Sequence, residues 1–362
     1  MTSTDVVVVG GGIAGLSLAA ALAPRCRVAL VEREPRLFAH TSGRSAQQSQ
    51  PTYGPAPIRR FTAATLRLLD DLPGGLVTPR PLVWLDRADN PGHLAHLLAE
   101  MDDLEPLAVD DAVALFPALR ADAVSGAALD AASVEVDVPA LRDLLVASAT
   151  AAGARLALGS GVTAARREGA DWIVEAGAET FRAPTVVVAA GPWADETAAL
   201  FGTTGFGLAP TRRTVVVATV HGEPVDPAAP MLMDAAHTFY LRPAGDGILA
   251  SSLEDEPSIP EDAQPRAEII HRTLDLLDRV TRLALGEPLR SWTGLRTLSP
   301  DGLPVVGWDA RREGLYWLVG QGGYGIQTSL GLAAAVADAL TGTALDAATA
   351  DDLAAFAPGR LA

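Results

Sequence analysis

Apolar residues near the start of the chain form three blocks, which predict a strand, a helix and a second strand. Residues 6–9 are a continuous run of valine, which is typical of a strand buried on both faces of a parallel sheet. The next block places apolar side chains along one stripe of a helix, namely Ile13, Leu16, Ala19, Ala20 and Ala23. Residues 27–31 predict the second strand. The chain therefore begins with a βαβ unit, the building block of an α/β fold.

Hydrophobic periodicity predicts further elements along the rest of the chain. Helices are expected over 57–72, 92–101, 137–152, 265–284 and from Gly325 to about 340, with a surface helix and turn within 102–123. Strands are expected over 80–86, 155–158, 162–166, 172–175, 180–182, 185–190, 214–220, 238–241, 248–252 and 315–319. In the helix over 265–284, the apolar stripe is Ile270, Leu274, Leu277, Val280 and Ala284. We expect the last twenty residues to pack loosely. The polar segment 33–57 is too polar for the core and long for a loop, which usually indicates function.

The turn after the first strand has the spacing of a dinucleotide-binding loop. Gly10, Gly12 and Gly15 form G-x-G-x-x-G, and Glu32 ends the second strand seventeen residues after Gly15. These glycines permit a tight turn, a close approach of pyrophosphate and close helix packing, while Glu32 can accept hydrogen bonds from ribose hydroxyls. The alternatives are a glycine-rich turn in another α/β unit or a membrane span over 5–23. The three glycines and the acid at its edge argue against a span.

Charge and cysteine content exclude several classes of protein. The 362 residues include 28 basic and 44 acidic side chains, a formal charge of −16, which disfavours nucleic acid and anionic membranes as partners. A single cysteine, Cys26, rules out an internal disulfide and a cysteine-rich metal site, and no metal is expected. The first strand begins at about Asp5, which leaves no room for a secretory signal. We therefore expect a cytoplasmic protein without a membrane span.

Several motifs in order along the chain carry a resemblance to a known family. The βαβ fingerprint is followed by a buried strand that ends in Ala189-Ala190-Gly191-Pro192-Trp193 and later by Asp301–Gly307. Together they resemble the D-amino-acid oxidase superfamily of FAD enzymes, which includes glycine and sarcosine oxidases. The bacterial D-arginine dehydrogenase branch is the most similar, through residues 43–46, 52–54, 212–213, 239–241, 292–296 and 321–329.

The resemblance implies the domain organisation. It implies an α/β protein with a Rossmann-like FAD-binding domain of the glutathione-reductase type. An interleaved α+β substrate domain would be built on an antiparallel sheet. The implied boundaries are 1–80, 139–205 and 297–362 for the FAD-binding domain, and 81–138 and 206–296 for the substrate domain.

The resemblance also implies FAD, bound non-covalently, and its binding residues. These are Gly10, Gly12, Ile13, Ala14, Gly15, Glu32, Arg33, Arg44, Ser45, Ala46, Val162, Ala190, Gly191, Trp193, Arg296, Gly322, Gly323, Tyr324, Gly325, Ile326 and Gln327. A helix opening at about Gly325 would stabilise negative charge on the reduced flavin, unless the glycine cluster is a simple turn. Some relatives attach flavin covalently through a histidine near His40, but we expect a surface or phosphate-neighbouring histidine there.

The implied reaction is the oxidative deamination of a D-amino acid, with hydride transfer from Cα to flavin N5. The imino acid would hydrolyse to a 2-oxo acid and ammonia, and O2, a quinone or another carrier would accept the electrons. Arg213 and Arg296 match carboxylate-binding arginines, and Tyr53 and Tyr240 match hydroxyl donors to the same carboxylate. Gly323 and Gln327 match positions near the substrate amine and the flavin. The alternatives are internal salt bridges, core tyrosines, turn geometry and a helix cap.

Three positions depart from the arginine-oxidising relative. Leu82, after Pro79-Arg80-Pro81, stands in place of a glutamate, and Gln48 and Gln50 stand in place of a histidine and a threonine. Because a buried cationic side chain without an acid is costly, we expect substrates with uncharged side chains.

Other functions stay open at this point. A glycine- or sarcosine-type oxidase, or an oxidase of a biosynthetic secondary amine, would share the carboxylate site. A flavin-binding subunit without turnover need not retain the arginines and tyrosines. An NAD-linked hydroxyacid dehydrogenase would have no use for the C-terminal glycine cluster. The motifs do not distinguish oxidase from dehydrogenase, and the oligomeric state is open.

Overall fold

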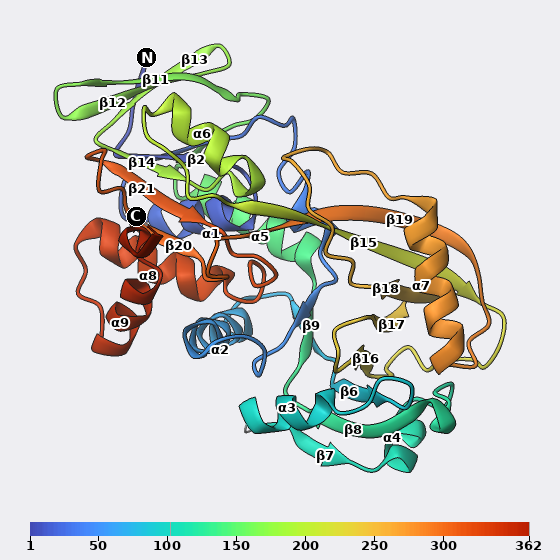
Figure 1. The fold of residues 1–362 in the computed structure, drawn as a ribbon. Coiled ribbons are helices and arrows are strands. Elements are labelled where there is room, and N and C mark those ends of the chain that lie inside the picture. Colours follow the sequence, from blue (N-terminus) through green and yellow to red (C-terminus); the bar gives the residue numbers. More distant parts are fainter. Residues whose placement is uncertain (102, 362) are drawn as a thin grey trace.

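The computed structural model describes residues 1–101 and 103–361, which fold around two large sheets (Figure 1). The helices are α1 (Ile13–Leu22), α2 (Ala56–Asp70), α3 (His93–Glu100), α4 (Val109–Leu115), α5 (Val138–Ala151), α6 (Ala194–Leu200), α7 (Ala267–Val280), α8 (Ser329–Thr341) and α9 (Ala347–Ala355). Short 3₁₀ helices span Thr41–Arg44, Ala121–Ala123, Gly191–Trp193 and Pro358–Leu361. Within these residues, no helix combines the length and the apolar character needed to cross a membrane.

The first sheet is a six-stranded sheet that begins with the predicted βαβ unit. Its order is β10 (Arg155–Ala157), β3 (Val28–Val31), β2 (Val6–Val9), β14 (Thr185–Val188), β21 (Leu315–Val319) and β20 (Val305–Trp308). All neighbours are parallel except β20 and β21. Val6 and Val8 face the core that contains α1, α5 and α8, whereas Val7 and Val9 face the opposite core. Burial on both faces explains the uninterrupted valine run.

A four-stranded sheet covers the second face of this parallel sheet. It comprises β1 (Thr2–Ser3), β13 (Glu179–Ala183), β12 (Asp171–Ala176) and β11 (Val162–Glu168). Trp172, Val174 and Phe181 from this sheet are buried against Val7 and Val9.

The second large sheet has eight strands and carries the remaining core. Its order is β19 (Leu285–Leu298), β15 (Ala209–Val220), β18 (Gly247–Ser251), β17 (Tyr240–Ala244), β16 (Met231–Asp234), β6 (Leu82–Arg87), β8 (Val124–Asp130) and β7 (Glu105–Leu107). It is antiparallel except for the pair β16 and β6. Figure 1 shows β15 and β19 reaching from the parallel sheet out beneath α7. A small sheet of β4 (Gln48–Ser49), β9 (Val134–Val136) and β5 (Val77–Pro79) lies between the two large ones.

The predicted mixed α/β class is confirmed, and the two large sheets differ as the resemblance implied. The parallel sheet carries the fingerprint, and the other sheet is almost wholly antiparallel. The domain boundaries themselves stay a prediction. At a local level, Asp137 caps α5 as predicted, because its carboxylate accepts a hydrogen bond from the Ala140 amide at 2.9 Å.

The amphipathic helix over 265–284 is shorter than predicted. It spans Ala267–Val280, and Ala284, assigned above to its apolar stripe, is exposed with φ of 47°. Leu283 takes the buried position instead. After Val280 the chain turns and enters β19, which is an edge strand. The sequence did not predict this strand, because Gly286 and Pro288 interrupt the alternation of apolar and polar residues along it.

Two further expectations about packing hold only in part. About half of the described residues 343–361 are exposed, as loose packing implies, but Phe356 is fully buried and the buried Asp352 pairs with Arg60 of α2. The polar segment 33–57 is not wholly outside the core, because Ser49 and Thr52 are buried. The Thr52 hydroxyl donates to Asp130, and the backbone of β4 pairs with β9, which a hydropathy pattern does not show. In the predicted helix and turn over 102–123, residue 102 lies outside the described residues, and β7 precedes α4.

Candidate cofactor and substrate site

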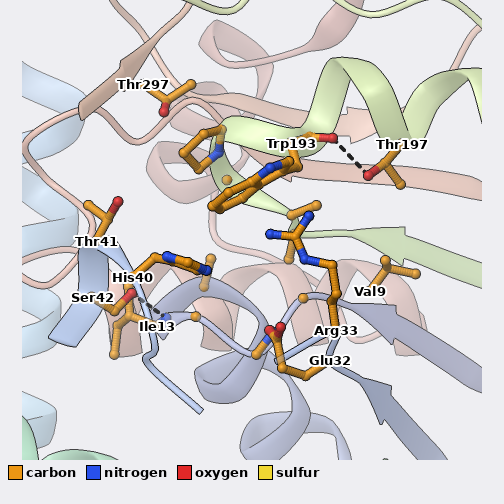
Figure 2. Close-up of a pocket in the computed structure, with 18 of the residues that line it drawn as sticks. Val9, Ile13, Glu32, Arg33, His40, Thr41, Ser42, Trp193, Thr197 and Thr297 are labelled. Atoms are coloured by element: carbon orange, nitrogen blue, oxygen red, sulfur yellow. Dashed lines mark hydrogen bonds between the residues drawn. The ribbon is translucent and has the colours of Figure 1, made fainter. Parts of the chain in front are cut away.

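A cavity of about 370 Å³ lies at the carboxyl ends of β2, β3 and β14. Its wall combines the glycine loop before α1, Glu32 and Arg33 after β3, and residues 189–193 after β14 (Figure 2). Residues 38–42, 161–162 and 320–322, together with Gly325, close it from other sides. A crevice at the carboxyl ends of parallel strands is where open α/β sheets bind ligands.

The glycine loop has the close packing that the fingerprint requires. A Cβ on Gly15 would lie 1.9 Å from the Gly10 carbonyl oxygen, so only glycine lets α1 approach β2 this closely. A Cβ on Gly12 would meet only Ser42 Oγ, at 3.2 Å. Figure 2 shows the hydrogen bond that the Ile13 amide donates to Ser42 Oγ, at 2.9 Å. The Ile13 amide is thus already paired within the protein, while the N-terminus of α1 at Gly12, Ile13 and Ala14 lines the cavity, where its dipole favours an anion.

The Glu32 carboxylate is held at the edge of the cavity by backbone amides. It accepts hydrogen bonds from the Gly11 amide at 2.5 Å and the Glu34 amide at 2.7 Å. Each carboxylate oxygen keeps a further lone pair, which a hydroxyl donor can use.

The Trp193 ring lines the cavity and packs against two side chains, Arg33 and His40. The guanidinium carbon of Arg33 lies 4.4 Å from the Trp193 ring centroid, and the His40 ring centroid lies 4.7 Å from it (Figure 2). His40 Nε2 also lies 3.0 Å from a Glu34 carboxylate oxygen. His40 therefore lines the cavity, with one ring nitrogen already paired.

Polar atoms without partners show that this cavity suits a polar ligand. Thr297 Oγ1 and Gln321 Nε2 are buried and make no hydrogen bond within the described residues, although both residues line the cavity. Buried polar groups are normally paired, so a bound molecule with several polar groups fits here. Together with the open glycine loop and Glu32, these atoms fit the polar chain of FAD.

A second cavity of about 150 Å³ adjoins the first and shares Ile13, Thr41, Ser42, Gly322 and Gly325 with it. The rest of its wall comes from segments far apart in the sequence. They are residues 44–46, Gln48, Gln50 and Tyr53, then Arg213 and Val215 of β15, Met231 and Met233 of β16, Tyr240 of β17, Gly294 and Arg296 of β19, and Gly323, Ile326 and Gln327.

The smaller cavity contains two arginines that lack a close anionic partner. Arg213 faces Gly294 across the β15–β19 ladder and Arg296 lies two residues further along β19, so both project from the same side. Arg213 Nη2 lies 3.4 Å from the exposed carboxylate of Asp255, and its Nε is buried without a partner. No hydrogen bond or ion pair of the Arg296 guanidinium joins it to the described residues.

Arg213 and Arg296 are two positive charges in a cavity without an acidic side chain among its described lining residues. Burial, with the positive charge of Arg296, lowers the pKa of Arg213 to about 10, so its guanidinium is still charged at neutral pH. None of the described residues lining the cavity is Asp or Glu. A Cβ on Gly323 would lie 3.0 Å from Arg296 Cζ, so a glycine there leaves room for the guanidinium. The cavity is therefore prepared for an anion.

Tyr53 and Tyr240 also line this cavity, whereas Tyr324 lines neither cavity. Burial raises the pKa of Tyr240, so its hydroxyl is neutral and can donate. Tyr324 packs against Tyr53 with ring centroids 5.3 Å apart, and burial raises the pKa of Tyr324 to about 12. Gln327 ties the Tyr53 segment to α2, because its amide donates to Thr62 Oγ1 at 3.0 Å.

The residues expected to bind FAD divide between the two cavities. The larger one is lined by Gly10, Gly12, Ile13, Ala14, Glu32, Arg33, Val162, Ala190, Gly191, Trp193, Gly322 and Gly325. Of the others, Arg44, Ser45, Ala46, Arg296, Gly323, Ile326 and Gln327 line only the smaller one. The Arg44 guanidinium donates to the Thr293 carbonyl at 2.7 Å and pairs with Asp262. Gly15 and Tyr324 line neither.

Two expectations about local geometry were wrong. The helix near Gly325 begins at Ser329, because residues 325–328 form a turn in which the Tyr324 carbonyl accepts from the Thr328 amide. Its N-terminus therefore lies four residues beyond the glycine that lines the cavities. Leu82 is fully buried and does not line the smaller cavity. Its neighbour on the adjacent strand, Met231, lines it instead.

Sequence reasoning missed part of each lining. In the larger cavity these residues include Gly11, Phe38, Ala39, Thr41, Ser42, Gly161, Glu196, Thr197, Leu200, Leu295, Thr297 and Gln321. In the smaller cavity they include Thr41, Ser42, Val215, Met231 and Met233. The alternation of Met231 and Met233 could have indicated a common strand face. Within the described residues, no group of three or more His, Cys, Asp or Glu side chains is placed to hold a metal.

Comparisons with known proteins agree on one family. Residues 5–339 match the family model DAO, described as FAD dependent oxidoreductase. Glycine oxidase of Geobacillus kaustophilus (strain HTA426) is 27% identical over 351 residues, which cover 90% of this chain and 89% of that enzyme. Its crystal structure superposes with a TM-score of 0.83 at 23% identity and 96% coverage of both chains.

Two other relatives extend the comparison. Human mitochondrial dimethylglycine dehydrogenase is 28% identical over 234 residues, or 59% of this chain and 27% of that enzyme. L-alpha-glycerophosphate oxidase from Mycoplasma pneumoniae, solved with FAD bound, superposes with a TM-score of 0.84 at 18% identity, over 94% of this chain and 95% of that one.

Proposed function

This chain belongs to the DAO family of FAD-dependent oxidoreductases, and on that premise we propose that it oxidises the α-amine of D-amino acids with uncharged side chains. FAD is its cofactor. When bound, FAD would accept a hydride, that is a proton with two electrons, from the substrate Cα, while the amine nitrogen loses a proton. The imino acid then hydrolyses in water to a 2-oxo acid and ammonia.

The two arginines without close anionic partners carry this proposal. A substrate carboxylate would satisfy Arg213 and Arg296 together and would relieve their mutual repulsion. The hydroxyls of Tyr53 and Tyr240 would donate to the same carboxylate. With the carboxylate fixed in this way, Cα is oriented toward the wall that the two cavities share, and positioning of this kind supplies much of the rate.

We propose that the larger cavity binds the ADP half of FAD. Its glycine loop and the first turn of α1 would receive the pyrophosphate, and Glu32 would accept from the ribose. The shared wall at Ser42, Gly322 and Gly325 would face the flavin ring. His40 has one nitrogen paired with Glu34, which supports non-covalent binding.

The lining of the smaller cavity supports uncharged substrate side chains. Val215, Met231 and Met233 are apolar, and no described lining residue is acidic, so a cationic side chain would be buried without a partner. Leu82 contributes only through its contact with Met231.

A second candidate is an oxidase of glycine or an N-methylated glycine. The small volume of about 150 Å³ favours it, as does the similarity to glycine oxidase. It would use the same arginines, and only the room beside Cα separates the two candidates. A flavin-binding subunit without turnover is disfavoured, because it would have no use for two partly buried cations without close anionic partners.

The test is an anaerobic titration of the purified, FAD-loaded protein with D- and L-amino acids, glycine and N-methylglycine. We expect D-amino acids with uncharged side chains to bleach the flavin absorbance band, and D-arginine and D-lysine to do so at least about tenfold less efficiently. Bleaching by glycine and N-methylglycine alone would select the second candidate. A flavin band that no amine bleaches would contradict both. Admitting air after reduction separates oxidase from dehydrogenase.

A further inference from the structure

The smaller cavity contains two glutamines whose polar ends are not satisfied. Gln48 and Gln50 both line it, and the Oε1 atom of each is buried without a hydrogen bond to the described residues. A buried carbonyl that loses its partner shifts an equilibrium by roughly 5- to 150-fold. Two such acceptors beside one small cavity indicate that a ligand supplies the donors.

The orientation of Gln48 is fixed by a neighbour. Its Nε2 donates to the Arg80 carbonyl at 2.9 Å, so its Oε1 is the end left for a ligand, and a carbonyl oxygen only accepts. The Gln50 carboxamide makes no side-chain hydrogen bond within the described residues, and it can present its oxygen or its amide.

Gln48, on β4 of the small sheet, is linked through Arg80 to the segment that leads into the eight-stranded sheet. Arg80 is followed by Pro81, whose carbonyl accepts from the Met231 amide at 2.9 Å, and Met231 lines the same cavity. The wall shared with the larger cavity is a different one, formed around Ser42, Gly322 and Gly325. Since the reacting Cα hydrogen has to face the cofactor, the substrate side chain can extend toward Gln48 and Met231.

The charge of the lining limits which substrate side chains can lie beside Gln48 and Gln50. A cation would find no acid among the described lining residues, and a second carboxylate would meet the fixed Gln48 oxygen. A hydrocarbon would leave both acceptors unpaired. An uncharged group with an N–H or O–H donor satisfies them.

We propose that Gln48 and Gln50 form a side-chain subsite for an uncharged hydrogen-bond donor. The site then prefers substrates that carry a carboxamide or a hydroxyl over hydrocarbon substrates of the same size. This proposal rests on the proposed function, because it concerns the side chain of the same amino-acid substrate.

The test compares substrate pairs that differ only in the donor. D-asparagine and D-leucine have similar shapes, as do D-serine and D-2-aminobutyrate. In the FAD-loaded wild type we expect the donor-bearing member to have a kcat/KM at least about tenfold higher. Gln48→Leu and Gln50→Leu should each reduce that ratio to below about threefold, with the FAD content unchanged. Gln50→Leu removes no side-chain hydrogen bond within the described residues. It therefore still tests the subsite if Gln48→Leu fails to fold.

The matched control is Gln264→Leu, the same change at an exposed position outside the cavity, which should keep the wild-type ratio. Equal use of D-leucine and D-asparagine by the wild type would overturn the subsite while leaving D-amino-acid oxidation intact. A preference that persists in both leucine variants would also overturn it. If no member of either pair bleaches the flavin, the proposed function itself fails, and the subsite with it.

Discussion

The two cavities meet along a shared wall, yet they are built in different ways. The larger cavity is built around a backbone feature, the glycine loop and the N-terminus of α1, with side chains such as Glu32 and Trp193 around it. The smaller one is formed by side chains from segments between residues 44 and 327, and several of them lack partners. A cofactor common to a family is bound by the local shape of the chain. A substrate is selected by side chains that only the tertiary structure brings together.

The largest expected effect is on the backbone-built cavity. Gly15→Ala would place a methyl group 1.9 Å from the Gly10 carbonyl oxygen, so α1 would have to move away from β2. We expect the FAD content of the purified protein to fall by about tenfold or more, with a lower unfolding temperature. The measurement is the ratio of flavin to protein absorbance.

Gly359→Ala is the control for this change, because a Cβ there meets nothing within 4 Å. It should retain full FAD content. A Gly15→Ala protein that retained FAD at the wild-type ratio would show that close packing of α1 is not required for cofactor binding.

The next largest effect is on the side-chain cavity and should leave the cofactor in place. Arg213→Met removes one of the two cations that would bind the substrate carboxylate, and we expect kcat/KM to fall by about 100-fold or more. The same change removes a buried charge that Arg296 repels, so the unfolding temperature of the substrate-free protein should rise. Steady-state kinetics and a thermal unfolding scan measure the two effects.

Arg290→Met, at an exposed position on β19, is the matched control and should change neither quantity. If Arg213→Met kept wild-type kinetics, the carboxylate would have to bind elsewhere. If Arg213→Met lowered the unfolding temperature, Arg213 would stabilise the fold and would not be an unpaired charge that a ligand neutralises.

A smaller effect concerns the segment that carries Gln50 and Tyr53. The Thr52 hydroxyl donates at 2.5 Å to Asp130, a fully buried carboxylate that also accepts from Ser133 Oγ at 2.9 Å. Thr52→Val keeps the shape and removes the donor, so the segment should be held less firmly. We expect KM to rise by roughly three- to tenfold with FAD content unchanged. Thr52→Ser should restore the wild-type KM, and an unchanged KM in Thr52→Val would contradict this role.

The smallest effect is a pH dependence of anion binding. The pKa of Arg213 is lowered to about 10, so its positive charge is lost as the pH rises through that value. A simple carboxylate such as acetate keeps its own charge over this range. Its binding, measured by competition, should weaken about twofold at pH 10 relative to pH 8 and further above. In Arg213→Met the same interval should be flat, and a flat wild-type profile to pH 11 would argue that Arg213 does not contact the anion.

The difference between the cavities also explains what the sequence could predict. The fingerprint and Glu32 lie close together in sequence, and the strand before Gly191 is a short apolar run of its own, so each was located by a local pattern. Arg213, Arg296 and the two tyrosines were found through the resemblance, not through spacing. Met231 and Met233 were missed because β16 is only four residues long, too short for their alternation to be conspicuous. That Met231 lines the cavity while its neighbour Leu82 does not depends on the packing of the sheet, which a local pattern does not show.

The central claim is that the arginine pair holds a substrate carboxylate beside FAD. The most direct test is to compare the rates at which D-alanine and D-alaninamide bleach the flavin band anaerobically. The two differ in the negative charge and hardly in size. We predict bleaching by D-alanine and a rate at least about 100-fold lower with D-alaninamide, a difference that Arg213→Met should largely remove. Equal rates with the two compounds would contradict the account, because the arginines would then have no part in binding the substrate.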